Sequence, residues 1–555
     1  MRLPLRAPAR LARSIGPLLL ATVLAAPAVI AVPAATTPVL AAEPNFPASY
    51  SGYHNWPEMV GEIMQAAQDY PSIVKVTSIG KSFQGRDIWM AKISDNVARD
   101  ENEPEVLIDA LHHAREHLTT EQALAILKWL THDYATDATV KRLVDTREIY
   151  IVFALNPDGM RYDLTGDPFR AWRKNRQTTV SGVPIYTDLN RNYGYRWACC
   201  GGSSSNRAAT TYHGPNVWSA PETRALRDFV NSRVINGIQQ IRTHITLHTN
   251  GELILWPYGY TKTNVPPDMT DQDHAAFVAM GRAMAARNGY TAEQSSDLYI
   301  TDGDQIDWLY FAHRIFSYTF ELYPTEQPTV IGDHYPPDEV IPTQTARNRS
   351  AILYLMDQAA CPWAAIGAAA AVNNCGPLYD DFELNRGWAR NPDGTDTATA
   401  GQWGRTIPAP TNASGPKQLR AASGLRAMVT GGAAGSSATA NDLDGGRTTL
   451  RSRAITLGAD AAKVGSLTFK YFFAHDAAST SGDVFRVQVE AGDGTRTTVF
   501  QQLGAGVDRD AAWTYVAVSI DAWAGQTIHV VFQAADGAAG NLVEAGVDDV
   551  RIRRE

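Results

Sequence analysis

Apolar and polar positions along residues 74–358 predict strands that alternate with helices. The run at 106–111 is apolar apart from Asp109, and the run at 241–247 carries Ile241, Ile245 and Leu247; both predict strands buried in a sheet. Apolar residues recur at helical spacing in 57–70 and in 343–358, which predicts helices there. Because strands and helices alternate, we expect an α/β domain with a mixed, largely parallel sheet flanked by helices.

The pattern changes near residue 377, where Gly, Ala, Thr and Asp become frequent. Short alternating runs recur at 467–473, 484–490, 528–532 and 547–552, and no helix of useful length is predicted. An all-β sandwich, jelly-roll-like, fits this pattern. The acidic residues at 380–383 and 548–549 lie near its two ends, where a calcium ion or simple solvation would account for them.

These patterns divide the 555 residues into four parts, which agrees with a chain too long for one ordinary domain. The parts are an export segment (1–42), an α/β domain (43–362), an Ala-rich linker (363–376) and a β-sandwich domain (377–555).

The export segment has the features of a signal peptide. Four arginines precede an apolar, Ala-rich stretch from about 15 to 32, and small residues suited to cleavage follow. A membrane anchor is the alternative, because the stretch approaches spanning length. Its prolines and small residues favour cleavage, so we expect a secreted protein with no membrane attachment once the signal is removed.

Charge and cysteine content limit the classes of partner and the disulfide pairings that the chain can have. The formal net charge of −9 argues against nucleic acid as a partner. Disulfides are permitted in an exported protein, and four cysteines allow three pairings. A local bridge between Cys361 and Cys375 is the simplest, although Cys199 and Cys200 are also adjacent.

A cluster of candidate ligands, His112-His113-Ala114-Arg115-Glu116-His117, follows the strand predicted at 106–111. The pattern Thr119-x-x-Gln122 predicts a helix start just after it. Ligands of open α/β sheets bind at such strand ends, and imidazoles with a carboxylate suit zinc. From spacing alone, His113 and Glu116 could be ligands, His113 and His117 could be ligands with Glu116 as base, or the loop could hold no metal.

Other polar residues also stand at or near strand ends. His248 follows the run 241–247, and Glu321 interrupts the apolar strand 315–322, where a carboxylate is costly unless it is paired or functional. Donor-rich stretches at 170–176 and 188–194 could hold an anion. The acidic loop 100–105 is either a solvated turn or a calcium site.

Taken in order, these motifs resemble the zinc metallocarboxypeptidases of the carboxypeptidase A type, and among them the secreted bacterial carboxypeptidase T. The resemblance covers about residues 45–375. Six separate motifs carry it: His113-x-x-Glu116, Trp172-Arg173-Lys174, Asp188-x-Asn190-Arg191-Asn192, His248 with Pro257-Tyr258-Gly259-Tyr260, Tyr299, and Phe320-Glu321-Leu322.

The resemblance implies one catalytic Zn²⁺ bound by His113, Glu116 and His248, the ligand set already known for carboxypeptidase A. It makes His117 a neighbour and Asp188 the residue that orients His113. Glu321 would act as general base and Arg173 would stabilise the oxyanion. The α/β domain would then be the catalytic domain of an exopeptidase.

The implied substrate is the C-terminus of a peptide or protein. Asn190 and Arg191 would bind the terminal carboxylate, Tyr299 would close over it, and Arg115 would contact the chain upstream. Ile306 corresponds to the floor of the side-chain pocket. We therefore expect a preference for apolar or aromatic C-terminal residues, with some acceptance of basic ones because Asp297 and Asp304 lie nearby in sequence.

The resemblance also implies structural Ca²⁺ in the acidic loop. The residues carried over are Asp100, Glu101, Glu103, Glu105 and Glu148, with Ser51, Tyr53 and Glu58 at a nearby site.

Two features depart from the family pattern. The signal runs almost directly into the mature-like start at Asn45, so a folded pro-segment is not expected, and Asn250 replaces a tyrosine near the third zinc ligand. The rival interpretation is an inactive carboxypeptidase-like secreted protein that binds through its sandwich, whose partner the sequence leaves unassigned. The presence of His113, Glu116, His248, Arg173 and Glu321 favours the enzyme.

Overall fold

The computed structural model describes residues 43–553 except 102, 236, 434–436, 440, 460–464 and 538–539. The predicted signal peptide, 1–42, lies outside the described residues. No described helix is long and apolar enough to cross a membrane.

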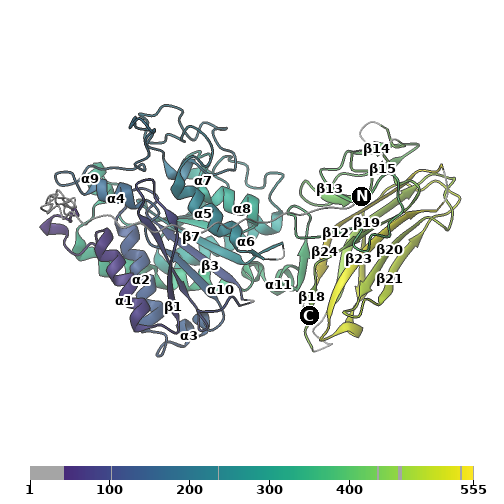
Figure 1. The fold of residues 1–555 in the computed structure, drawn as a ribbon, viewed down its shortest axis with the longest axis horizontal. Helices are drawn as coiled ribbons and strands as arrows, with labels where there is room; N and C mark the ends of the chain where they lie inside the picture. Colours follow the sequence, from purple (N-terminus) through teal and green to yellow (C-terminus); the bar gives the residue numbers. More distant parts are fainter. Residues whose placement is uncertain are drawn as a thin grey trace, which may run out of the picture. The chain divides into compact units, whose positions relative to one another are not determined.

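An eight-stranded mixed sheet forms the centre of the α/β domain (Figure 1). Its strands, in spatial order, are β1 (Val74–Lys81), β2 (Asp87–Ile93), β4 (Glu148–Val152), β3 (Glu105–Ala110), β7 (Ile241–Thr249), β10 (Phe316–Leu322), β8 (Leu253–Trp256) and β9 (Thr291–Gln294). The four strands from β4 to β10 are parallel to one another. This confirms the mixed, largely parallel sheet.

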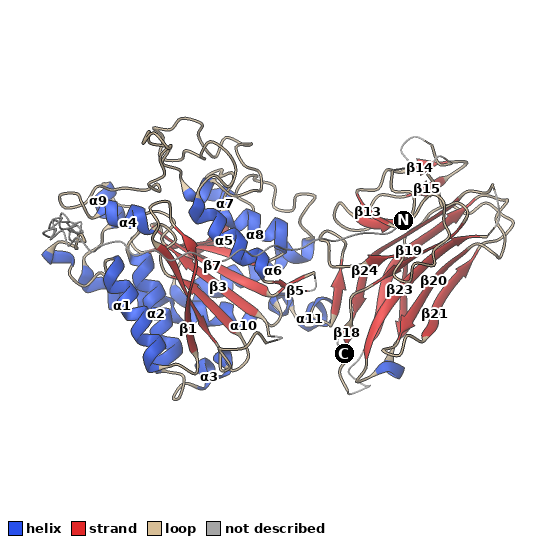
Figure 2. Ribbon diagram, in the orientation of Figure 1, coloured by secondary structure: helices blue, strands red, loops and turns tan. Residues whose placement is uncertain are grey.

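Helices flank this sheet (Figure 2). They are α1 (Trp56–Asp69), α2 (Leu118–His132), α3 (Ala138–Val144), α4 (Pro157–Asp163), α5 (Pro221–Ser232), α6 (Asp271–Asn288), α7 (Ser295–Leu298), α8 (Gln305–His313), α9 (Val330–His334) and α10 (Ile341–Gln358). A further helix, α11 (Ala368–Asn374), follows in the linker. A two-stranded ribbon, β5 (Val234–Ile235) with β6 (Ile238–Gln239), precedes β7.

Local sequence explains the central elements. Every residue of β3 and β4 is buried, as expected for strands covered on both faces. Helix α1 begins with a capping box, in which Asn55 and Glu58 bond to each other's backbone N–H. The helix buries Met59 and Ile63, two of its apolar positions, in the core.

The capping box predicted from Thr119-x-x-Gln122 does not form. Helix α2 begins at Leu118 without a side-chain cap, because the Thr119 hydroxyl donates to the Glu116 carbonyl and accepts from the Leu111 N–H. Helix α5 also lacks a side-chain cap, because Glu222 instead accepts from the Phe83 N–H and the Asn175 amide. At both helix starts, the side chain that would form the cap is instead hydrogen-bonded to residues outside the helix.

The predicted linker is helical in the structure. A 3₁₀ helix (Pro362–Ile366) and α11 occupy it, and the expected Cys361–Cys375 disulfide spans this segment. Cys199 and Cys200 form a second disulfide between neighbours in the chain.

Residues 378–552 form the expected β sandwich, with two antiparallel sheets. One contains β13 (Gly404–Thr406), β16 (Ala427–Val429), β24 (Val543–Ile552), β19 (Ser466–His475) and β22 (Thr514–Ser519), with β11 (Leu378–Asp380) added on β24. The other contains β12 (Ala389–Arg390), β17 (Gly446–Arg451), β23 (Thr527–Asp536), β20 (Val484–Glu490) and β21 (Arg496–Leu503), with β18 (Ile455–Thr456) on β23. A hairpin joins β14 (Thr411–Asn412) to β15 (Pro416–Gln418).

Apolar side chains from both sheets pack into one core. Phe469 of β19 and Val547 of β24 share it with Phe485 of β20 and Phe532 of β23, and Trp403 is also fully buried there. The tryptophan at 403 is therefore a core residue and not a surface platform.

Candidate active site

The candidate ligands meet at the carboxyl ends of three neighbouring parallel strands. His113 and Glu116 lie on the loop after β3, His248 lies near the end of β7, and Glu321 lies near the end of β10. His248 and Glu321 are direct partners in the register between β7 and β10. Strand order therefore brings together residues that are more than 200 positions apart in the chain, at the edge where α/β sheets bind ligands.

His113, Glu116 and His248 form one tight, buried cluster. The Nδ1 atoms of the two histidines lie 3.1 Å apart, and the Glu116 carboxylate lies 2.7 Å from His113 Nδ1 and 3.0 Å from His248 Nδ1. Tetrahedral zinc with bonds of about 2.0–2.1 Å needs ligand atoms roughly 3.3 Å apart. The donor types and their convergence fit a zinc ion.

Burial and neighbouring charges shift the pKa values of this cluster towards the protonation states that a metal requires. Burial lowers the pKa of His248 to about 4, which keeps its imidazole neutral as a metal ligand must be. The two histidines hold the pKa of Glu116 well below its usual value despite burial.

Asp188 supports the cluster from outside. Its Oδ1 lies 3.2 Å from His113 Nε2, the ring nitrogen that points away from the cluster, and its Oδ2 accepts from Arg173 Nε at 3.0 Å. A carboxylate on the second nitrogen fixes the tautomer that presents Nδ1 to a metal. Asp188 therefore orients both His113 and Arg173.

His117 lies outside the cluster. Its Nε2 contacts the Asp163 carboxylate at 2.9 Å, and its ring packs against Phe46, Phe169 and Tyr335. This geometry disfavours the inverted pattern in which His117 is a ligand.

A cavity of about 490 Å³ opens beside the three ligands. Every substrate-contacting residue predicted from the sequence lines it: Arg115, Arg173, Asn190, Arg191, Tyr299, Ile306 and Glu321. Tyr299 is 49% exposed at its rim, whereas Arg191 is 2% exposed and Ile306 is 3% exposed. Burial and the Glu116 charge raise the pKa of the Glu321 carboxyl, and Arg173 and Arg191 oppose that rise.

The cavity lining is mostly polar, but four aliphatic side chains belong to it. They are Leu253, Leu255, Leu298 and Ile306. Asp304 also lines the cavity, but its carboxylate already caps α8 at Asp307 N and accepts from the Thr301 hydroxyl. Asp297 does not line the cavity.

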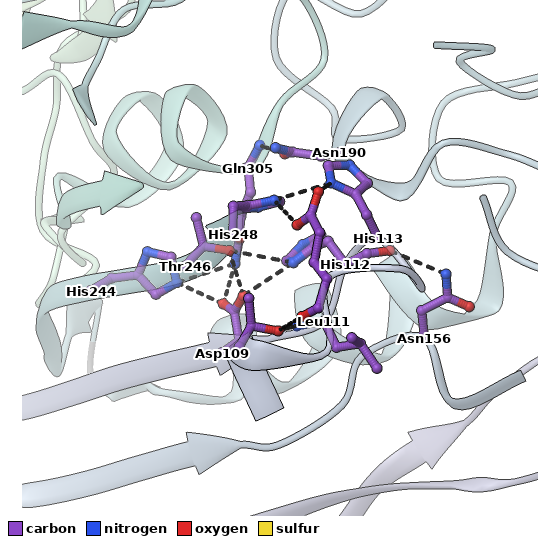
Figure 3. Close-up of polar contacts among 12 residues, drawn as sticks. Asp109, Leu111, His112, His113, Asn156, Asn190, His244, Thr246, His248 and Gln305 are labelled. Carbon is purple, nitrogen blue, oxygen red and sulfur yellow. Dashed lines mark hydrogen bonds and ion pairs between the residues drawn. The ribbon is translucent and has the colours of Figure 1, made fainter. Parts of the chain in front are cut away.

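A buried polar network beneath the cluster was not predicted from the sequence (Figure 3). The Asp109 carboxylate contacts His244 Nε2 at 2.6 Å, Thr246 Oγ1 at 2.8 Å, Gln305 Nε2 at 2.6 Å and His112 Nδ1 at 3.2 Å. Four donors from three elements thus satisfy one buried charge. The Gln305 N–H also donates to Asn190 Oδ1 at 3.0 Å, which joins the network to the cavity.

The spacing of polar residues along β7 is the one sequence feature that could have predicted this network. His244, Thr246 and His248 are two residues apart and point to the same face of the strand.

Comparison with known proteins agrees with this geometry. Residues 59–351 match the family model described as zinc carboxypeptidase. A zinc carboxypeptidase of Saccharothrix mutabilis subsp. capreolus is 51% identical over 317 residues, which cover 57% of this chain and 72% of the relative. This chain belongs to the zinc carboxypeptidase family. It is a metallocarboxypeptidase, and the family implies a catalytic Zn²⁺.

A more distant relative and a solved structure are also similar to this chain. Bovine carboxypeptidase A1 is 30% identical over 298 residues, covering 53% of this chain and 67% of the relative. The crystal structure of thrombin activatable fibrinolysis inhibitor superposes with a TM-score of 0.50 at 25% identity, covering 55% of this chain and 74% of that one.

Proposed function

We propose that this metallocarboxypeptidase is a secreted exopeptidase that removes apolar or aromatic residues from the C-termini of peptides, with Glu321 as general base. The observation that carries the proposal is the register pairing of His248 with Glu321, beside a cavity that Arg191 and Ile306 also line. Secretion rests on the signal-like sequence of residues 1–42.

His113, Glu116 and His248 would hold the zinc. When bound, zinc supplies an activated water and polarises the scissile carbonyl. Glu321 takes the proton from the attacking water and passes it to the leaving amine. Arg173, fixed by Asp188 and only 13% exposed, donates to the oxygen on which negative charge develops, where a preoriented cation is most effective.

Asn190 and Arg191 bind the terminal carboxylate, and Tyr299 closes over it from the rim. The Arg191 guanidinium makes two hydrogen bonds to backbone carbonyls, of Gly202 and Asn190, and so keeps further N–H groups for a carboxylate. Arg115 contacts the peptide upstream, since its buried Nε has no partner among the described residues.

The aliphatic side chains that line the cavity, Leu255 and Ile306 among them, support a preference for apolar and aromatic C-terminal residues. Acceptance of basic residues is the weaker part of the proposal, because both oxygens of Asp304 already accept hydrogen bonds. We expect blocked dipeptides that end in Phe or Leu to be hydrolysed fastest, and those ending in Lys or Arg more slowly. Dipeptides amidated at the C-terminus are the matched controls, and equal hydrolysis of the amides would contradict the exopeptidase assignment.

The same proposal includes a structural calcium ion near the acidic loop. Asp95, which the sequence did not single out, brings a carboxylate oxygen within 4.8 Å of ligand oxygens of Glu101 and Glu103. One buried oxygen on each of these three residues has no hydrogen-bond partner among the described residues. Burial and the other two carboxylates raise the pKa of Glu103 to about 7, and a bound Ca²⁺ would offset this repulsion.

The remaining predicted calcium ligands have other partners. Asp100 and Glu105 contact the Arg233 guanidinium, and Lys92 Nζ donates to Glu148 at 2.7 Å. At the nearby site, Glu58 is engaged in the capping box of α1, and the Tyr53 hydroxyl donates to the Pro336 carbonyl. Calcium at Asp100, Glu105 and Glu148, and at Ser51, Tyr53 and Glu58, stays a prediction with less support than the site at Asp95.

A further inference from the structure

The segment 199–202 carries an exposed disulfide close to the proposed carboxylate site. Cys199 and Cys200, both exposed, are joined to each other. The Asp302 carboxylate, itself 1% exposed, holds this segment through one oxygen. That oxygen, Oδ2, accepts from Cys200 N at 3.0 Å and from Gly202 N at 2.9 Å.

The same segment fixes the direction of Arg191. The Gly202 carbonyl accepts from Arg191 Nε at 2.9 Å, and the Asn190 carbonyl accepts from Arg191 Nη1 at 2.6 Å. A guanidinium is a rigid plane, so a fixed Nε determines where its other donors point. Displacement of Gly202 would therefore turn the Arg191 fork away from a bound carboxylate.

Close packing transmits any movement of this segment. A Cβ on Gly202 would lie 2.2 Å from the Thr301 carbonyl carbon, so the backbones touch directly. Two residues after Thr301, a Cβ on Gly303, whose φ is +63°, would lie 2.8 Å from the Arg191 carbonyl oxygen. Residues 301–303 are thus wedged between the disulfide segment and the backbone of Arg191.

From these contacts we propose that the Cys199–Cys200 disulfide and Asp302 are positioning elements for Arg191, and that reduction of the disulfide weakens binding of the substrate carboxylate. The bridge between neighbouring residues closes a small ring that restricts the backbone leading into Gly202. Reduction by a phosphine breaks the S–S bond and forms two cysteine thiols. The phosphine gives up two electrons and becomes a phosphine oxide, with its oxygen and the two thiol protons taken from one water molecule.

The experiment starts from a background in which only this disulfide is present. In the zinc-loaded C361S/C375S chain, the phosphine reductant tris(2-carboxyethyl)phosphine should raise KM for a blocked dipeptide ending in Phe by about tenfold, equal to about 1.4 kcal/mol, with kcat within a factor of two. Reoxidation with oxidised glutathione should restore KM. The C199S/C200S/C361S/C375S chain should have the high KM throughout and should not respond to the reductant.

Asp302 provides an independent test. D302A removes the one oxygen that accepts from both N–H groups and should raise KM in the same way. D302N should retain a KM near that of the unmodified chain, because the amide oxygen can still accept from both N–H groups. A role only in stability would lower the Tm of D302A without separating KM from kcat.

This inference rests on the proposed role of Arg191, and R191A separates the two. If R191A raises KM but reduction, C199S/C200S and D302A all leave it unchanged, the inference is wrong and the proposed function stands. If R191A also leaves KM unchanged, the carboxylate assignment itself is wrong, and the inference is overturned with it.

Discussion

The Nδ1 atoms of His113 and His248 lie 3.1 Å apart, facing each other across the Glu116 carboxylate. A zinc ion bound by both imidazoles would require their ligand nitrogens to lie about this close together. The residues are 135 positions apart and lie at the ends of adjacent parallel strands.

This relationship predicts the zinc ligands individually. H248A should weaken zinc binding by more than the roughly 10–100-fold typical of residues that only support a ligand. H117A should keep zinc near the level of the unmodified chain, since His117 contacts Asp163 outside the cluster. Zinc content after dialysis against buffered zinc measures both. Loss of zinc in H117A with retention in H248A would favour the inverted ligand pattern instead.

The network around Asp109 predicts a large stability effect. D109A leaves buried donors of His244, Thr246 and Gln305 without an acceptor, so it should lower the free energy of unfolding by about 3 kcal/mol or more. S317A, which removes only the contact with His244 Nδ1 at the edge of the network, should cost about 1 kcal/mol. Urea unfolding of the zinc-loaded chains measures both. Equal losses would show that Asp109 does not organise the network.

Glu222 predicts a pH dependence of stability. Burial raises the pKa of its carboxyl to about 7, so the folded chain binds this proton more tightly than the unfolded chain does. The contribution of Glu222 is then most favourable below about pH 4.5 and falls as the pH rises towards 7, by a total on the order of 3 kcal/mol. The difference in unfolding free energy between the unmodified chain and E222Q should shrink over that window. A constant difference would mean that Glu222 is ionised throughout.

The acidic loop predicts selective stabilisation by calcium. Adding Ca²⁺ to zinc-loaded, calcium-depleted protein should raise Tm, and D95N or E101Q should reduce that shift. D100N is the matched control and should keep the shift, because Asp100 contacts Arg233. Differential scanning calorimetry with Mg²⁺ in place of Ca²⁺ completes the comparison. An unchanged Tm, or an equal effect of Mg²⁺, would contradict a calcium site.

The periodicity of the sequence was sufficient to predict the strands whose ends form the site. The apolar runs at 106–111 and 241–247 became β3 and β7, and the polar residues at their ends became the cluster. Local spacing could not choose between Glu116 and His117, because that choice depends on Asp163 and Phe169, which lie well beyond the loop.

Long-range partners explain the other differences. The acidic loop looked uniform in sequence, yet Arg233, 128 positions after Glu105, contacts Glu105, whereas Glu101 and Glu103 lie in a separate acidic group with Asp95. Asp109 and His244 are likewise 135 positions apart, so the sequence around one residue does not indicate that the other contacts it.

Hydrolysis of a blocked dipeptide ending in Phe by zinc-loaded E321Q, beside the unmodified chain, tests the central claim most directly. Glutamine keeps the size of the side chain but cannot accept the proton of the attacking water. We expect release of phenylalanine by the unmodified chain, sensitive to a zinc chelator, and a fall in kcat of at least about 100-fold in E321Q with zinc content unchanged. Full activity in zinc-loaded E321Q would contradict the role of Glu321, and no release by the folded, zinc-loaded unmodified chain would contradict the proposed exopeptidase function.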